Sequence, residues 1–206
     1  LLESGPKFTP EDHWAFMRDT KNLMAARIAP LMSAALTGHS DTQPAGEVLA
    51  AWDHRDEPGA AAPAIFQSVY RHFARRVFED DLGPELTARY LGSYYLWHER
   101  LALLLEDADS DWFDDQRTPG RETRDDLFHL AGQDALAELR PVLGDDVRRW
   151  EWGQVHTVTF FSPLVPGNAA AGILGGGVHP KEGSGETLNR ATFRFDRPYA
   201  ATSIAS

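Results

Sequence analysis

The sequence predicts an α+β protein that is mainly helical, with a few β-strands near the C-terminal end of the chain. Apolar residues recur at helical spacing through much of the first 149 residues, whereas β-branched and aromatic residues gather after residue 150. The 206 residues, of which 42% are hydrophobic, suffice for a packed core. We therefore expect a helical domain over residues 1–149. Residues 150–206 should supply strands and a long Gly- and Pro-rich loop that belong to a core sheet.

The first helix should begin at Thr9. A threonine cap, a proline in the first turn and acidic residues near the positive end of the helix dipole follow one another there. In the apolar row that follows, Pro30 should kink or break the helix and Gly38 should end it. We expect a polar linker over residues 39–47 and then a short helix over residues 48–52.

The most regular helical pattern starts at Pro63 and ends near a loop at residues 80–83. Its apolar face is formed by Ile65, Phe66, Val69, Tyr70, Phe73 and Val77. Pro84 should open a short helix after the loop. A further helix, rich in Leu, should cover residues 94–105.

An acidic loop is predicted over residues 107–116, and the last long helix should begin at Thr118-Pro119. This helix should run to about Leu139, and Gly144 should end the helical part. No internal repeat and no low-complexity tract interrupts this order. The change of composition near residue 150 is therefore the candidate domain boundary.

The C-terminal part should contain two or three strands, at residues 155–161, 187–195 and 199–206. Residues 163–185 are rich in Gly and Pro and should form a loop. A loop that long is usually functional or wraps another part of a larger protein. Two or three strands also need further partners to make a stable sheet. We therefore expect strands outside this chain to complete it.

Charge and composition exclude several classes of function. A net charge of −11 disfavours nucleic acid as a partner, since phosphate contacts need clustered Lys and Arg, and it disfavours an anionic membrane surface. No apolar run reaches the roughly 18 residues of a membrane span. Cysteine is absent, which excludes disulfides and thiolate chemistry. Because the chain begins at Leu1 without an initiator Met or a signal peptide, we expect a piece of a longer chain.

The most informative motif is a W-x-W-G-x-x-H box at residues 150–156, followed by a Gly-rich loop and by T-x-N at residues 187–189. Weaker landmarks precede it in order: Leu1-Leu2, Phe8-Thr9-Pro10-Glu11-Asp12, Asp19, Ala29-Pro30-Leu31-Met32, Leu49-Ala50-Ala51-Trp52-Asp53, Asp114-Asp115, Thr118-Pro119 and Glu122-Thr123. Together they resemble the large chain of the penicillin acylase (penicillin amidase) family. Those enzymes are N-terminal-nucleophile hydrolases with a four-layer αββα core.

The resemblance implies hydrolysis of a linear amide, such as the acyl side chain of a β-lactam or an N-acyl homoserine lactone. In that family a serine at the start of the large chain attacks the amide, and its own amine acts as general base. The asparagine that holds the oxyanion, and the calcium ligands of some members, precede the stretch that matches this chain. The resemblance therefore assigns no catalytic and no metal-binding residue here, leaves the substrate-binding residues unknown, and leaves any calcium outside this segment.

The same resemblance implies that the parent protein is a precursor that cleaves itself into two chains. The partners of this segment would be the small chain, the rest of the large chain and a small-molecule amide. The location would be periplasmic or secreted. This chain alone is expected to be inactive, because the nucleophile lies elsewhere.

Several motifs of the sequence allow both a structural and a functional interpretation. Trp150, Trp152 and His156 could line a pocket, but large rings at this spacing are more often core, with Gly153 permitting close backbone packing. Ser184 lies in a flexible Gly-Ser-Gly loop and is interpreted as a turn residue, since no G-x-S-x-G motif surrounds it. Ser4 would be a nucleophile only after trimming of the chain. Gly175-Gly176-Gly177 lacks the ending of a phosphate-binding loop.

Two alternative functions remain open on the sequence. One is a metal-dependent hydrolase that uses His98, Glu99 and the acidic loop. The acids of that loop are Asp107, Asp109, Asp111, Asp114 and Asp115. None of the eight histidines forms the H-E-x-x-H motif, and the loop lacks EF-hand spacing. The other alternative is a non-catalytic helical interaction module, in which every motif above serves packing alone.

Overall fold

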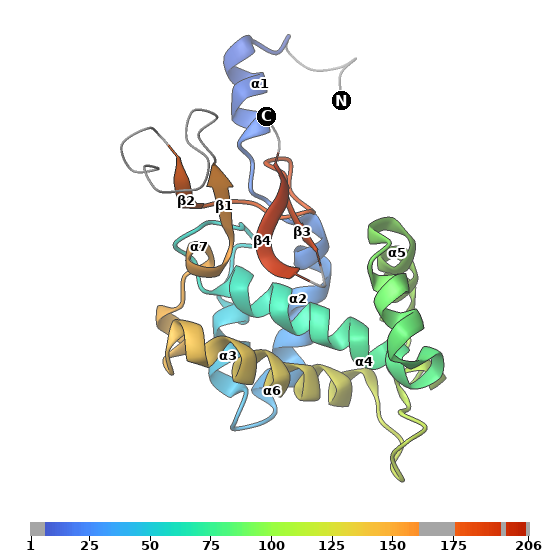
Figure 1. The fold of residues 1–206 in the computed structure, drawn as a ribbon. Coiled ribbons are helices and arrows are strands. Elements are labelled where there is room, and N and C mark those ends of the chain that lie inside the picture. The colour runs from blue at the N-terminus through green and yellow to red at the C-terminus, as the bar shows by residue number, and fades with distance from the viewer. Residues whose placement is uncertain (1–6, 161–175, 195–196, 205–206) are drawn as a thin grey trace.

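The fold is mainly helical with one small sheet, as the sequence predicts (Figure 1). The computed structural model describes residues 7–160, 176–194 and 197–204. Its helices are α1 (Pro10–Met17), α2 (Leu23–Thr37), α3 (Gln43–Ala50), α4 (Ala62–Leu91), α5 (Tyr94–Leu104), α6 (Arg124–Leu143) and α7 (Trp152–Val155). Two short 3₁₀ turns, η1 (Asp111–Phe113) and η2 (Val147–Arg149), flank α6.

The strands are β1 (Thr157–Phe160), β2 (Gly177–Pro180), β3 (Ala191–Arg194) and β4 (Arg197–Ile204). They pair in the order β2-β1-β4-β3. The outer pairs are antiparallel, and β1 pairs with β4 in parallel. The sheet lies on one side of the crossed helices α2, α4 and α6 (Figure 1).

Local signals place several helix ends correctly. Thr9 caps α1 and Thr123 caps α6, each in a reciprocal pair with an aspartate three residues on. Gly38 ends α2 and Gly144 ends α6, as expected. In α4, Gly83 leaves the helical conformation with φ 73° and ψ 164°, so Pro84 opens a second limb of this helix.

Three expectations about the helices were wrong. The predicted long first helix is two helices, α1 and α2, and α2 continues through Pro30, which lies on its exposed side. The carbonyl of Ala26, which has no N–H donor at Pro30, can then face water, and the buried side of α2 holds the helix. Residues 39–47 are not a linker, because α3 starts at Gln43 and packs on α2. Helix α6 starts after Thr123 and not at Thr118-Pro119, because Thr123 makes the cap.

Three expectations about the strands also need correction. The predicted loop at residues 163–185 contains β2, which pairs with β1 over four residues; residues 161–175 lie outside the described part. The strand expected at residues 187–195 begins only at Ala191, because residues 183–190 form a turn. Residues 152–155 form α7, so β1 starts later than predicted. Strand β4 confirms the strand expected near the C-terminal end.

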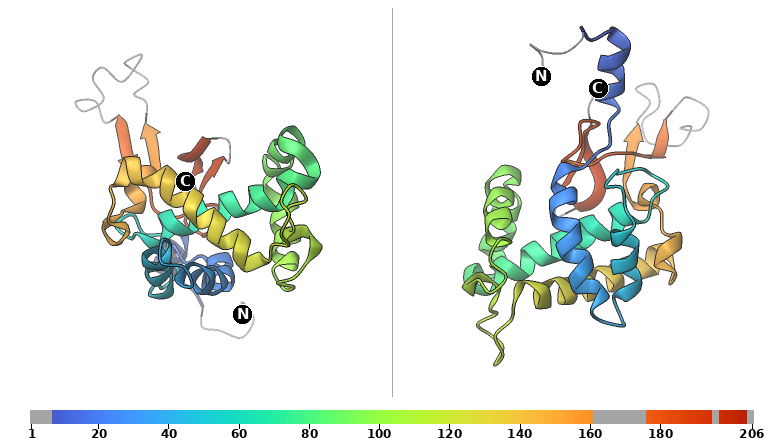
Figure 2. Two further views of the ribbon diagram at one scale, coloured as in Figure 1. Left: turned by 90° about the horizontal axis from the view of Figure 1, so that it is seen from below. Right: turned by 180° about the vertical axis from the view of Figure 1, so that it is seen from behind.

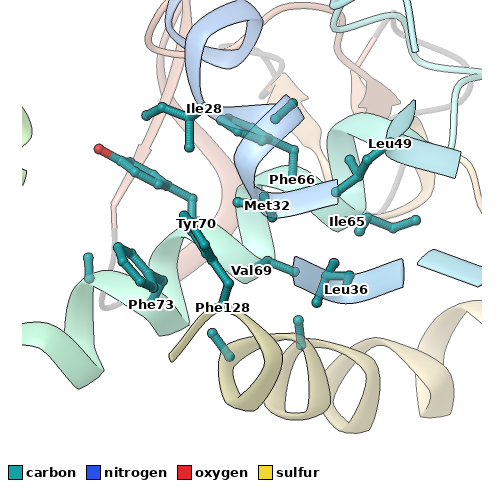
Figure 3. Packing of buried hydrophobic residues seen from close by; sticks show 14 of the residues in the cluster. Ile28, Met32, Leu36, Leu49, Ile65, Phe66, Val69, Tyr70, Phe73 and Phe128 are labelled. Atoms are coloured by element: carbon teal, nitrogen blue, oxygen red, sulfur yellow. The ribbon is translucent and has the colours of Figure 1, made fainter. Parts of the chain in front are cut away.

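The hydrophobic core fills the space between α2, α4 and α6 (Figure 3). Phe73 of α4 stacks on Phe128 of α6 with ring centroids 4.0 Å apart, and both side chains are fully buried. The predicted apolar face of α4 is buried from Ile65 to Val77. The same cluster includes Trp152 from the C-terminal part. The division of the chain near residue 150 stays a prediction.

Candidate functional site

The two tryptophans of the W-x-W-G-x-x-H box are core residues. Trp150 is 1% exposed and donates a hydrogen bond from Nε1 to the carbonyl oxygen of Gly144 at 2.8 Å. Trp152 is fully buried and donates from Nε1 to the carbonyl oxygen of Gly183 at 3.1 Å. A Cβ at Gly153 would come within 2.8 Å of Pro180, so this backbone packs closely. The structural interpretation of the box agrees with this burial.

His156, the last residue of the box, is also fully buried and stacks on Trp152 at 4.3 Å. Its Nδ1 lies 2.6 Å from the carbonyl oxygen of Tyr199, which can only accept, so Nδ1 carries a proton. Burial lowers the pKa of His156 to about 4. The ring is therefore neutral at pH 7 and joins the box to β4 as a structural donor.

The box supports a tight turn at residues 183–190, which contains the T-x-N motif. Gly183 has φ 81°, and a Cβ there would lie 1.9 Å from the carbonyl oxygen of Asn189. The hydroxyl of Thr187 accepts from the backbone N–H of Ser184 at 3.0 Å and lies 2.7 Å from the same Asn189 oxygen. The turn therefore needs glycine at position 183, where any Cβ would clash. It uses the hydroxyl of Thr187 to satisfy backbone groups of the turn.

Segments from the other end of the chain hold the turn in place. The backbone N–H of Asn189 donates to the carbonyl oxygen of Asp19 at 2.9 Å, and the backbone N–H of Gly183 donates to that of Asp56 at 2.8 Å. The side chain of Asn22 donates to the Asp56 carboxyl group at 3.1 Å and to Ser184 Oγ at 3.4 Å. Family landmarks far apart in sequence, Asp19 and Asn189, thus meet at one place.

The Asp56 carboxyl group is the buried ionisable group in the centre of this cluster. Asp56 and Asn22 are fully buried, and Ser184 is 1% exposed. Burial raises the pKa of Asp56 to about 7, and the hydrogen bonds from Ser184 and Asn22 only partly offset this rise. Its second oxygen, Oδ1, has no hydrogen-bond partner within the described part of the chain. The carboxyl group is therefore poised between its neutral and charged forms near neutral pH.

An open hollow of about 560 Å³ lies beside the turn, between it and α1. Glu57 and Glu182 line it together with Asn189. Each is held: Glu57 accepts from the hydroxyl of Thr20 at 2.5 Å, and the amide of Asn189 donates to Glu182 at 3.0 Å. Lys181 donates to the Asn189 side-chain oxygen at 2.7 Å. The hollow has a fixed polar wall on the side of the turn.

The buried polar cluster can hold the turn at residues 183–190 in a fixed orientation, but it offers no group that could attack an amide. Ser184 is a turn residue, as expected, but it is buried rather than in a flexible loop, and its hydroxyl accepts from Asn22 and from the backbone N–H of Glu186. The acidic group beside it is Asp56, and His156 is engaged with Tyr199. Ser184, His156 and Asp56 are therefore not aligned for nucleophilic attack.

The residues suggested for a metal site are not brought together. His98 stacks on Trp97 at 3.7 Å and lies 3.1 Å from the Tyr70 hydroxyl, while burial lowers its pKa to about 4. In the acidic loop, Asp111 and Asp115 are paired with arginines 121 and 117. Over residues 7–160, 176–194 and 197–204, no three His, Asp or Glu side chains could hold a metal ion.

Two further candidates fall outside the described residues: Ser4 and Gly175. Gly177, the last glycine of the run, begins β2, which is not the context of a phosphate loop. Sequence reasoning missed Asn22 and Asp56 as parts of the buried cluster. The only signal for them was the position of Asp56 in a polar loop, and nothing marked Asn22.

The comparisons place this chain in a family. The model of the penicillin amidase family matches residues 1–206, so the chain belongs to that family. It is 29% identical over 173 residues to the acyl-homoserine lactone acylase QuiP of Pseudomonas putida, covering 74% of this chain and 21% of the relative. The acylases of the same name from Pseudomonas fluorescens and Pseudomonas aeruginosa are 27% and 25% identical, covering 75% and 73% of this chain.

The chain spans about a fifth of the length of these relatives. No helix within the described residues is both long and apolar enough to cross a lipid bilayer.

Proposed function

We propose that this chain is part of an amidohydrolase that cleaves linear amides, and that the attacking nucleophile lies outside these 206 residues. The observation that carries the proposal is the family match over residues 1–206, because the related proteins named above are acylases. The buried cluster supports it, since its polar groups bind one another and leave no reactive pair. N-terminal-nucleophile chemistry, by a serine that uses its own amine as base, is the mechanism we propose.

In this proposal the chain serves as scaffold. The helical core would support one wall of the acyl pocket, and the turn at residues 183–190 would hold neighbouring strands of an αββα core. The dense hydrogen bonding of the turn supports this role, because catalysis needs reacting groups to be positioned to within a fraction of an ångström. The fixed polar wall beside α1 would face other parts of the same polypeptide.

The proposed substrate is an N-acyl homoserine lactone, with the acyl side chain of a β-lactam as the second candidate. The names of the relatives favour the first. The proposed partners are the small chain and the rest of the large chain, released from one precursor. A periplasmic or secreted location, and calcium bound outside this segment, belong to the same proposal.

The first test is direct turnover. The purified chain is incubated with decanoyl homoserine lactone and with a chromogenic phenylacetyl amide, and released amine is measured. We expect no hydrolysis. Any turnover would contradict the proposal, because it would place the chemistry within this chain, and Ser184→Ala would show whether Ser184 carries it.

The second test asks whether the chain supports catalysis in its family context. A chimera is made in which residues 7–204 replace the matching segment of the Pseudomonas putida acylase QuiP. We expect it to release homoserine lactone, and a matched chimera with Gly183→Ala to lose most of this activity. If the first chimera folds and is inactive, the scaffold role proposed for this segment is wrong.

Two alternative functions receive less support. A metal-dependent hydrolase would need ligands that meet, and His98 and the acidic loop are separately engaged. Metal analysis of the purified chain tests this alternative. A non-catalytic helical interaction module would leave the QuiP chimera inactive, which separates it from the amidohydrolase.

A further inference from the structure

A groove of about 780 Å³ opens where α4 bends at Gly83. One wall is the first limb of α4, which contributes Arg71, Arg75 and Glu79 at a spacing of four residues. The other wall is the second limb and the start of the next helix, from Pro84 to Ser93. Figure 2 shows this second limb and α5 standing away from the helical body. The groove is distinct from the turn at residues 183–190.

Positive charge gathers in this groove although the chain as a whole carries a net charge of −11. Three arginines line it, at positions 71, 75 and 89, against the single carboxylate of Glu79. The Nε of Arg75 lies 3.8 Å from the carboxylate of Glu79, a long contact between an exposed and a half-buried side chain. Arg89 makes no ion pair or hydrogen bond with any other described residue, beyond what its backbone contributes to the helix. Because Arg71 is itself paired with Glu138 and Arg75 lies near Glu79, the uncompensated guanidinium charge of the groove is that of Arg89.

Arg71 is the fixed member of the three. It is 6% exposed, and its Nη2 contacts the carboxylate of Glu138 and the hydroxyl of Tyr199, whose ring centroid is 5.7 Å from the guanidinium carbon. Its Nε is buried without a hydrogen-bond partner within the described part of the chain. A buried donor left unpaired costs free energy, so an acceptor brought to Nε would stabilise this guanidinium.

Apolar and hydroxyl groups complete the lining. Leu91, Ala88 and Pro84 form an apolar strip along the second limb, and Thr87 and Ser93 add hydroxyl groups. Arginine presents a planar fork of donors that matches the two oxygens of a carboxylate. An apolar strip beside such a fork fits a molecule with a charged head and a short hydrocarbon tail.

We propose that this groove binds a carboxylate with an apolar tail, a role that goes beyond amide hydrolysis and does not depend on it. The carboxylate lies between Arg71 and Arg89, and the hydrocarbon tail lies along Pro84, Ala88 and Leu91. The bend at Gly83 sets the spacing of the two walls. Arg75 and Glu79 form the rim.

The test is a calorimetric titration of the folded protein with octanoate, with methyl octanoate and with inorganic phosphate. We expect saturable binding of octanoate and at least tenfold weaker binding of both other probes, since one loses the charge and the other loses the tail. Equal binding of the methyl ester would overturn the ionic contact. Equal binding of phosphate would overturn the apolar subsite, and absence of octanoate binding would overturn the proposal.

Variants locate the site. Arg89→Gln removes an exposed charge without disturbing the core, and it should weaken octanoate binding about tenfold or more, the effect of losing one charge-assisted hydrogen bond. Arg148→Gln is the matched control, because Arg148 is an exposed arginine that is paired with Glu47 and does not line this groove. Unchanged binding by Arg89→Gln, or equal loss in the control, would place the ligand elsewhere.

Discussion

The helical core and the turn at residues 183–190 are both buried, but they are held by different forces. Between α2, α4 and α6, apolar side chains fill the space, as the stacking of Phe73 on Phe128 illustrates. Around the turn, hydrogen bonds join buried polar groups such as Asn22 and Asp56. The turn itself also needs a glycine of positive φ, Gly183. The core should therefore respond to lost volume, and the turn to changed backbone or charge.

The largest effect is expected from emptying the core. Phe73→Ala should lower the free energy of unfolding by about 3–5 kcal/mol, because it removes a fully buried ring and leaves a cavity against Phe128. Urea unfolding measures the change. Phe73→Leu, which keeps most of the volume, should cost clearly less, and Leu103→Ala at an exposed position should cost little. Equal costs for the three variants would contradict apolar packing as the force that holds this region.

The turn should respond to a single methyl group. Gly183→Ala should lower the free energy of unfolding by about 2–4 kcal/mol, because the new Cβ meets the Asn189 carbonyl oxygen and φ is positive. Gly59→Ala is the matched control, since a Cβ there would meet nothing within 4 Å, and it should be nearly neutral. If both substitutions are neutral, the turn is not the tight element described above.

Charge in the buried cluster should make stability depend on pH. The raised pKa of Asp56, about 7 against 3.8 for an ordinary aspartate, means that the folded state binds this proton more tightly. Its contribution to the free energy of unfolding is greatest below about pH 4 and falls as the pH rises to about 7. His98 and His156 act in the opposite direction. Their pKa values are lowered to about 4 from 6.5, so their contribution is lost as the pH falls through that range.

Because these contributions partly cancel, the protein itself should show a modest pH dependence between pH 4 and 7. Asp56→Asn removes the contribution of the carboxyl group, so its free energy of unfolding should rise more steeply with pH over this interval. Urea unfolding at four pH values measures the difference. Asp145→Asn, at an exposed position, is the control. Parallel curves for Asp56→Asn and the unmodified protein would show that this carboxyl group titrates normally.

The smallest effect is expected at the helix caps. Thr123→Ala removes the side-chain cap of α6, a helix that packs in the core, and should lower the free energy of unfolding by about 1 kcal/mol. Thr9→Ala removes the same cap from α1, which has no buried residues, and should leave global unfolding unchanged. A loss of the same size from Thr9→Ala would show that α1 contributes to the cooperative core.

Local patterns in the sequence were sufficient for the elements whose signals are local. The apolar spacing of α4, the helix-ending glycines 38 and 144, and the aromatic box at residues 150–156 were interpreted correctly from neighbours within a few residues. Helix α3 was expected only from residue 48 because the segment before it is polar, and strand β2 was missed because it lies in a Gly-rich stretch; both are ordered by packing. The composition of a short segment does not report such packing.

The candidate site was less accessible to sequence reasoning for the same reason. The contact between Asn22 and Ser184 joins residues 162 positions apart, and neither residue type signals burial. Ser184 was interpreted as a turn residue in a flexible loop because Gly-Ser-Gly is typical of one, and nothing in that motif signals burial. The structure instead makes it a buried acceptor beside Asp56, since the strands around it return to the first part of the chain.

The sequence by itself determined the family, the mainly helical fold class and the acidic charge of this protein, because motif order, apolar periodicity and composition are written along the chain. Tertiary structure decided which polar groups are buried together, the protonation of Asp56 and the concentration of arginine in one groove. These properties depend on the distance between side chains and on the water excluded from them. Both quantities exist only once the chain has folded.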